Sequence, residues 1–247
     1  LSIALRLLIL ASVATDAVRA RRHATEWRDP PHVALFPINA DGSAEAARAI
    51  AALDQESFAA IDNFFAAEAE RYGRSIRRPV HVTLQPPFTA LPPPAPENAS
   101  ALAAMRWSLA LRFWAWRQAK AVPRADVRLY ALYWGSDRTR VPASHGLRQG
   151  QIGVAHLYAQ PAMAGGNALV LAHELAHTLG ASDKYDPATL LPRFPEGYAE
   201  PEKGLPQSDC ELMAGRTPLR ADLAEQPSSL AHCRLGPATA LEIGLKL

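Results

Sequence analysis

The stretch AHELAHTLGASDKYD, residues 172–186, places three titratable side chains on an otherwise apolar segment. His173, Glu174 and His177 lie among alanine, leucine and valine residues that run from position 168 to 179. A helix that is apolar on every side is expected to be buried. Because burying an unpaired polar group costs roughly 2 to 7 kcal/mol, these three side chains need a partner.

The spacing of the two histidines indicates what that partner is. His173 and His177 are four residues apart, so on a helix they lie on one face. Two imidazoles so placed can bind one metal ion, and Glu174 then lies where its carboxylate reaches a water molecule on that metal. The alternative is a chance match on a helix whose histidines bond to the backbone.

The residues after this helix offer a third ligand. Gly180 fits the left-handed residue that ends a helix, and the chain can then turn back and present Asp183 to the same ion. Two imidazole nitrogens and one carboxylate oxygen suit zinc, and three protein ligands leave a fourth position for water. We rank Asp183 ahead of four other carboxylates, Asp186, Glu196, Glu200 and Glu211. A distant glutamate would need a second helix, which the prolines between 187 and 206 disfavour.

With His173, Glu174, His177, Gly180 and Asp183 in the pattern HExxHxxGxxD, the chain resembles the metzincin clan of zinc endopeptidases, and the snapalysin-type members of that clan carry Asp as the third ligand. It is most similar to the small snapalysin-type bacterial enzymes, in which a tyrosine follows the third ligand by two residues, as Tyr185 does here. Met213, in CELMAGR at 210–216, resembles the methionine of their Met-turn. The resemblance covers about residues 150 to 235, and the N-terminal half is more similar to uncharacterised bacterial proteins.

The resemblance implies an α+β fold with a twisted mixed sheet, two long helices, an active-site helix and a short, loop-rich C-terminal subdomain. It implies a catalytic domain over residues 21–247, divided into 21–180 and 181–247, and a disulfide between Cys210 and Cys233. The implied activity is hydrolysis of peptide bonds by zinc-activated water, with Glu174 as general base and then general acid. Tyr185 and Tyr198 are candidate donors to the developing oxyanion.

Three alternative functions stay open at this stage. The zinc ion can be purely structural, in a non-catalytic envelope protein. The protein can be a zinc hydrolase that acts on a non-peptide amide. The third alternative is a metal-free binding module that uses the tryptophan-rich helix and the proline-rich loop at 86–97.

The rest of the chain predicts alternating strands and helices. Short apolar or alternating runs predict strands at 32–38, 79–85, 125–134 and 151–159, the last as an edge strand above the cleft. One or two helices are expected from Ser43 to Tyr72, and another, with core tryptophans at 107, 114 and 116, from Ser100 to about Lys120. Asn167 is the expected cap of the histidine-bearing helix, and Pro237 the start of a short last helix. We expect His145 and His156 to be solvated or packed.

The composition limits the functional classes. The chain has 247 residues, 49% of them hydrophobic, enough for one large domain or two small ones with a buried core. Its net charge of +2, from 26 basic and 24 acidic side chains, lacks the basic excess of a nucleic-acid-binding protein. We therefore expect no nucleic-acid partner. The resemblance implies a peptide or protein substrate, and we expect a monomer.

The N-terminal segment predicts export. Within residues 1–20, Arg6 precedes an apolar run from Leu7 to Val13, and Val18 and Ala20 offer the small residues of a cleavage site. This pattern is typical of a secretory signal peptide or a short signal anchor. The protein is then periplasmic or secreted, or held to the membrane by an uncleaved N-terminus. In an exported chain the two cysteines favour a disulfide, whereas in the cytosol they would be free thiols.

Overall fold

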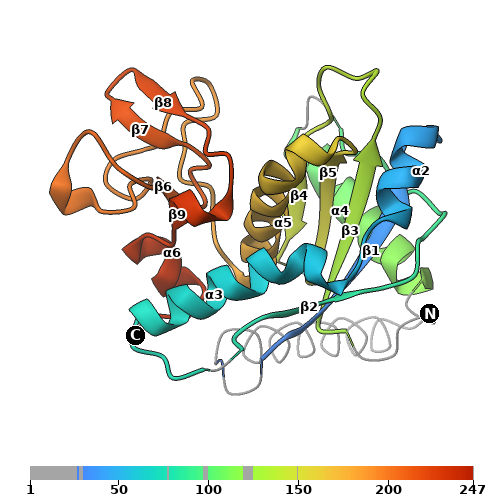
Figure 1. Cartoon of the computed structure of the whole chain (residues 1–247), viewed down its shortest axis with the longest axis horizontal. Coiled ribbons are helices and arrows are strands. Elements are labelled where there is room, and N and C mark those ends of the chain that lie inside the picture. Colours follow the sequence, from blue (N-terminus) through green and yellow to red (C-terminus); the bar gives the residue numbers. More distant parts are fainter. Residues whose placement is uncertain are drawn as a thin grey trace.

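The computed structural model describes residue 27 and residues 30–76, 78–96, 100–118, 125–148 and 150–246. Over these ranges the chain forms the predicted α+β fold, with a twisted mixed sheet between layers of helices (Figure 1). The expected signal segment, residues 1–20, lies outside the described residues. Among the described helices, none combines the length and the apolar character that a transmembrane span requires.

The central sheet has five strands in the order β2-β1-β3-β5-β4. Four of them are parallel and match the predicted strands to within two residues at either end: β1 (His32–Asn39), β2 (His81–Leu84), β3 (Val127–Trp134) and β5 (Ile152–Tyr158). The fifth, β4 (His145–Leu147), runs antiparallel to β5 and forms the edge. The prediction that β5 is the edge strand is therefore wrong, because a three-residue strand is too short to show an alternating pattern.

Alternate residues of the strands point to two separate cores. Residues such as Leu129 and Ala131 face three helices, α2 (Ala44–Ala51), α3 (Ala59–Arg71) and α5 (Ala164–Leu179). Residues such as Tyr130 and Leu132 face α4 (Ala101–Gln118), which covers the opposite side of the sheet (Figure 1). The period of two along a strand produces this division. It buries α5, the helix that carries the histidines, against the sheet.

The helices α2 and α4 begin where the sequence predicted, directly after Ser43 and Ser100. The hydroxyl of Ser43 accepts a hydrogen bond from the backbone N–H of Ala46 at 3.1 Å, and that of Ser100 from Ala103 at 3.3 Å. Ser43 therefore caps its helix as expected, and Ser100 caps the helix that was expected to begin there. The expectation that every tryptophan of α4 is core is wrong for Trp116, whose exposed fraction is 70%. It lies on the side of the helix away from the sheet.

The chain after α5 is rich in loops, as expected. It contains a short parallel pair, β6 (Cys210–Glu211) and β9 (Cys233–Arg234), a hairpin of β7 (Thr217–Arg220) and β8 (Leu223–Glu225), and the six-residue α6 (Pro237–Glu242). The predicted disulfide between Cys210 and Cys233 joins β6 to β9. Such a bond is typical of extracellular or periplasmic proteins. Leu212, Leu235 and Leu245 pack into the same core as α3 and α5.

Candidate metal centre

The helix α5 begins earlier than the sequence predicted. It starts at Ala164, directly after a 3-10 turn at Pro161–Met163, so Asn167 lies inside it and is not its cap. The Asn167 side chain instead binds the end of β5: its oxygen accepts from the Tyr158 N–H at 3.0 Å, and its amide donates to the Tyr158 carbonyl at 2.7 Å. Asn167 thus fastens α5 to the sheet.

The end of α5 turns the chain back toward the histidines. Gly180 ends the helix with φ of +116°, the left-handed conformation that was predicted and that glycine adopts without a steric cost. The N–H groups of Gly180 and Ala181 both donate to the Ala176 carbonyl at 3.0 Å, which closes a tight reversal. Asp183 follows three residues later and therefore lies beside His173 and His177.

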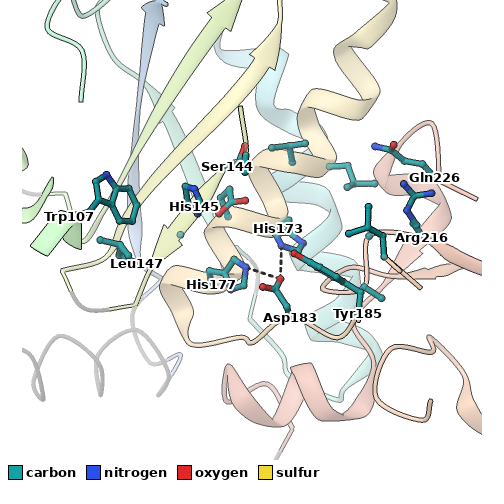
Figure 2. Close-up of a pocket in the computed structure, with 18 residues that line it drawn as sticks. Trp107, Ser144, His145, Leu147, His173, His177, Asp183, Tyr185, Arg216 and Gln226 are labelled. Atoms are coloured by element: carbon teal, nitrogen blue, oxygen red, sulfur yellow. Dashed lines mark ion pairs between the residues drawn. The ribbon is translucent and has the colours of Figure 1, made fainter. Parts of the chain in front are cut away.

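The three predicted ligands come together at one point. The Nε2 atoms of His173 and His177 each lie 3.2 Å from Oδ1 of Asp183 (Figure 2). All three atoms lie within 4.8 Å of one another, and among the described residues no other group of three or more could hold a metal ion. Tetrahedral ligands about 2.1 Å from a zinc ion are about 3.4 Å apart, close to the 3.2 Å that separates each Nε2 from Oδ1 of Asp183.

The hydrogen bonds of the two imidazoles fix which nitrogen faces Asp183. Nδ1 of His173 is 3.0 Å from the Leu212 carbonyl, and Nδ1 of His177 is 2.9 Å from the Ala181 carbonyl. A carbonyl only accepts, so each Nδ1 carries the hydrogen, and in the neutral ring Nε2 presents a lone pair. Two lone pairs and a carboxylate oxygen then point at one another, and Oδ1 has no hydrogen-bond partner of good geometry among the described residues. This arrangement calls for a cation, and backbone carbonyls on Nδ1 are the usual support of a metal-binding histidine.

The electrostatics of the cluster also favour a positive charge. Burial by itself would lower the pKa of His173, but Asp183, the charge of Glu174 and the Leu212 carbonyl outweigh it and raise that pKa to about 9. Burial would raise the pKa of Asp183, yet the two imidazoles hold it well below 3.8. The cluster therefore stabilises a proton on His173, and a bound metal cation would satisfy the same negative charge of Asp183.

Glu174 has the environment of a proton-transfer group. Its carboxylate is buried and lines the same cavity as the three candidate ligands, and Oε2 has no hydrogen-bond partner among the described residues. Burial raises its pKa, against the charges of His173 and His177, which lower it. A carboxylate with a raised pKa and a free oxygen can accept a proton and later release it.

A cavity of about 570 Å³ surrounds the cluster, between β4 and the C-terminal part of the chain. His145 of β4 and Trp107 of α4 line one side, with their rings 5.1 Å apart, and Tyr185, Arg216 and Gln226 line the other (Figure 2). Burial lowers the pKa of His145, as expected for a packed histidine, but its place in the cavity was not predicted. His156 is packed elsewhere and accepts from the Trp134 indole at 3.0 Å.

The rival carboxylates have other partners. Asp186 accepts from the N–H of Ala188 at 2.7 Å, and Glu200 pairs with Lys203 at 2.6 Å. Glu211 is fully buried and accepts from three donors at 2.7 to 3.1 Å, the hydroxyl of Thr239 and the N–H groups of Gly236 and Ala214. Neither these three nor Glu196 belongs to the cluster.

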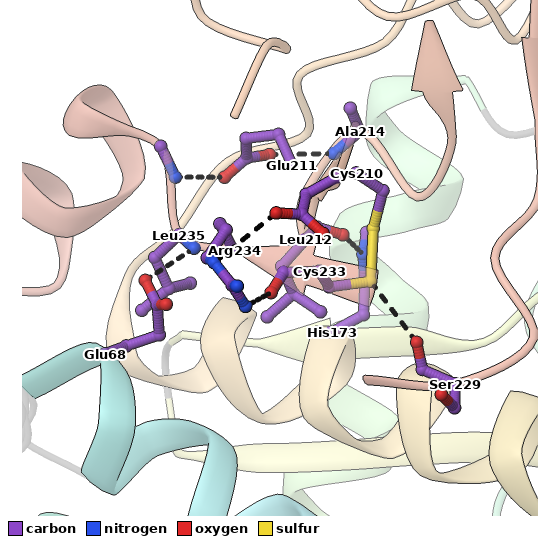
Figure 3. The surroundings of a disulfide bond; sticks show 12 residues. Glu68, His173, Cys210, Glu211, Leu212, Ala214, Ser229, Cys233, Arg234 and Leu235 are labelled. Carbon is purple, nitrogen blue, oxygen red and sulfur yellow. Dashed lines mark hydrogen bonds and ion pairs between the residues drawn. A yellow bond between two sulfur atoms is a disulfide. The ribbon is translucent and has the colours of Figure 1, made fainter. Parts of the chain in front are cut away.

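Residues 211–215, which contain Met213, form a turn beside the cluster. The N–H groups of Ala214 and Gly215 donate to the Glu211 carbonyl at 3.0 Å, and Met213 is completely buried. The turn supplies the Leu212 carbonyl that holds His173, and the disulfide fixes its start (Figure 3). Of the two tyrosines considered, Tyr185 lines the cavity, whereas Tyr198 is buried against Phe194 outside it. The assignment of Tyr198 as an oxyanion donor is therefore wrong.

Two further features of the site gave no usable sequence pattern. Glu242 of α6 accepts from the Ser182 N–H at 2.9 Å and from buried Lys184 at 2.7 Å, so it holds both neighbours of Asp183. Gly146 of β4 lies so close to α5 that a Cβ there would overlap His177 and lie 2.5 Å from the Glu174 carbonyl oxygen. Both contacts join segments that are far apart along the chain, and neither residue type indicates such a role by itself.

Comparison with known proteins adds little. No family model matches the chain, and no curated protein is similar to it. Two crystal structures of wild-type OgpA from Akkermansia muciniphila are similar in structure at 16% sequence identity, with TM-scores of 0.43 and 0.45. The alignment covers 86% of this chain and 58% of the OgpA chain. At these TM-scores the similarity carries no inference about activity.

Proposed function

We propose that this protein is a zinc-dependent endopeptidase of the metzincin type. The observation that carries the proposal is the convergence of two Nε2 atoms and one carboxylate oxygen, from His173, His177 and Asp183, on a single point. The carbonyls on both Nδ1 atoms leave the lone pairs free for a metal. Because the described cluster has three protein ligands and opens on a cavity, a catalytic ion fits it better than a structural one, which takes four.

In this mechanism the chain's own residues bind the substrate and move one proton. When bound, zinc would act as a Lewis acid that activates water and polarises the scissile carbonyl. Oε2 of Glu174 accepts a proton from the attacking water and delivers it to the nitrogen of the departing amine. The outer edge of β4 is unpaired among the described strands, so an extended peptide can add to it through main-chain hydrogen bonds.

The substitution Glu174→Gln tests the proposed role directly. We expect the variant to keep its zinc, because Glu174 is not a ligand, and to cleave casein at least about 100-fold more slowly, because an amide cannot accept the proton. Zinc is measured by mass spectrometry and cleavage by the release of soluble peptides. Glu200→Gln, at a surface ion pair, is the matched control and should cleave like the parent. Full activity of the Glu174→Gln protein would refute the mechanism.

The ligand assignment has its own test. His177→Ala should lower the zinc content far more than His145→Ala, because only the first imidazole reaches Asp183. Equal losses would mean that the ligands are wrongly assigned. Replacing casein with a non-peptide amide in the same assay separates a peptidase from an amidase that uses the same centre.

A further inference from the structure

The helix α4 carries an apolar stripe on its solvent-facing side. Twelve large hydrophobic side chains are exposed in the described part of the chain, and five of them lie on this one helix: Leu102, Met105, Leu109, Phe113 and Trp116. Their exposed fractions run from 55% to 70%. Single exposed apolar residues are normal on a protein surface, but a group of this size needs an explanation.

The five residues are aligned along the helix. At 100° per residue they fall within a sector about 80° wide, and its centre lies opposite the side chains of Leu111 and Ala115. Those two residues are buried against the sheet. Phe113 and Trp116 stack on each other, with ring centroids 5.8 Å apart. The helix therefore has two apolar faces, and packing in the described structure covers only one of them.

Arginines border the stripe on both sides. By the same angular spacing Arg112 lies along one margin, and Arg106 and Arg117 lie along the other. None of the three forms an ion pair with a residue that the structure describes. The sequence has no aspartate or glutamate between Glu97 and Asp126, so nothing on the helix offsets these charges.

We propose that α4 is a docking surface for an anionic lipid bilayer. A helix with tryptophan, phenylalanine and leucine on one face, bordered by arginine, is suited to lie flat in the headgroup region with its apolar face inserted. The arginines would then meet the lipid phosphates. A two-fold contact between copies fits less well, because it would bring the arginines of both helices together. The inference does not depend on the proposed peptidase activity.

The first test measures binding of the full chain to vesicles. Phosphatidylcholine vesicles with 30% phosphatidylglycerol, about the charge density of an anionic membrane surface, are compared with pure phosphatidylcholine by sedimentation. We expect Leu109→Glu/Phe113→Glu to bind the charged vesicles at least about tenfold more weakly than Leu241→Glu, the matched control on α6 with 61% exposure. Binding should also weaken in high salt. Equal binding by the two variants would overturn the proposal.

The second test asks whether α4 itself contacts the bilayer, independently of any membrane binding by the N-terminal segment. Residues 1–26 contain no tryptophan, so quenching of tryptophan fluorescence by brominated lipid reports on the rest of the chain. The quenching should be lost in Trp116→Phe and kept in Trp134→Phe. If neither substitution changes it, or if the parent dimerises in sedimentation velocity and Leu109→Glu/Phe113→Glu does not, the stripe contacts something other than lipid and the proposal fails.

Discussion

Replacing Gly146 with alanine would separate the edge strand β4 from the helix α5. A Cβ at this position would lie 2.5 Å from the carbonyl oxygen of Glu174 and would overlap Cβ of His177. Ordinary contacts of a Cβ begin near 3.4 Å, so one of the two elements must move by about 1 Å. Both obstacles are fixed, because one is helix backbone and the other is the Cβ of a candidate ligand.

The size of the effect follows from that displacement. Inserting one carbon into a packed interface costs about 1 to 3 kcal/mol, which lowers the melting temperature of a chain of this length by about 2 to 12 °C. The effect on cleavage should be larger, because a 1 Å shift of a catalytic group can cost about 100-fold in rate. The same Cβ would lie 3.2 Å from Oε2 of Glu174. Zinc should be retained, since the imidazoles are held from Leu212 and Ala181 and not from β4.

The control for this experiment is Gly166→Ala, on the same helix α5. A Cβ at position 166 meets nothing within 4 Å. Alanine is a better helix former than glycine, so this variant should be about 0.5 to 1 kcal/mol more stable and equally active. Thermal unfolding, zinc content and casein cleavage are measured for both variants and the parent. If Gly146→Ala melts and cleaves like the parent, β4 does not pack on α5 in the way described.

Three other predictions follow from the same structure. Asp183→Ala should lower bound zinc at least about tenfold. Glu211→Ala should keep its zinc but lose about 3 kcal/mol of unfolding free energy, because three buried donors lose their acceptor. Zinc analysis and thermal unfolding distinguish the two variants, and the reverse pattern would contradict both assignments. Cys233→Ser opens a disulfide with a sequence separation of 23 and should cost about 3 kcal/mol on the chain-entropy model, measured by denaturant unfolding against the parent. Burial lowers the pKa of His156 from 6.5 to about 4. The neutral ring therefore contributes at most about 3 kcal/mol to the free energy of unfolding, fully present above pH 6.5 and lost as the pH falls toward 4. The stability of His156→Gln should vary less over that pH range, and identical pH profiles of the variant and the parent would exclude this role.

The features that the sequence determined by itself are local. His173 and His177 share a face because the helical repeat fixes the directions of residues four apart. Gly180 and Asp183 follow within six residues of His177, and a left-handed glycine allows only a tight reversal, so the third candidate ligand was also within reach of sequence reasoning. The four parallel strands could be located because strands buried on both faces read as short apolar runs and a half-buried strand alternates with a period of two.

Only the tertiary structure decided which distant segments meet. The Leu212 carbonyl that orients His173 is 39 residues away, and Glu242, which holds both neighbours of Asp183, is 58 residues from Lys184. The short β4, the buried role of Glu211 and the exposure of Trp116 likewise depend on which surfaces are already covered by other elements. Spacing along the chain fixes the direction of a side chain relative to its own helix or strand. It does not fix what lies in that direction, because this depends on how the whole chain packs.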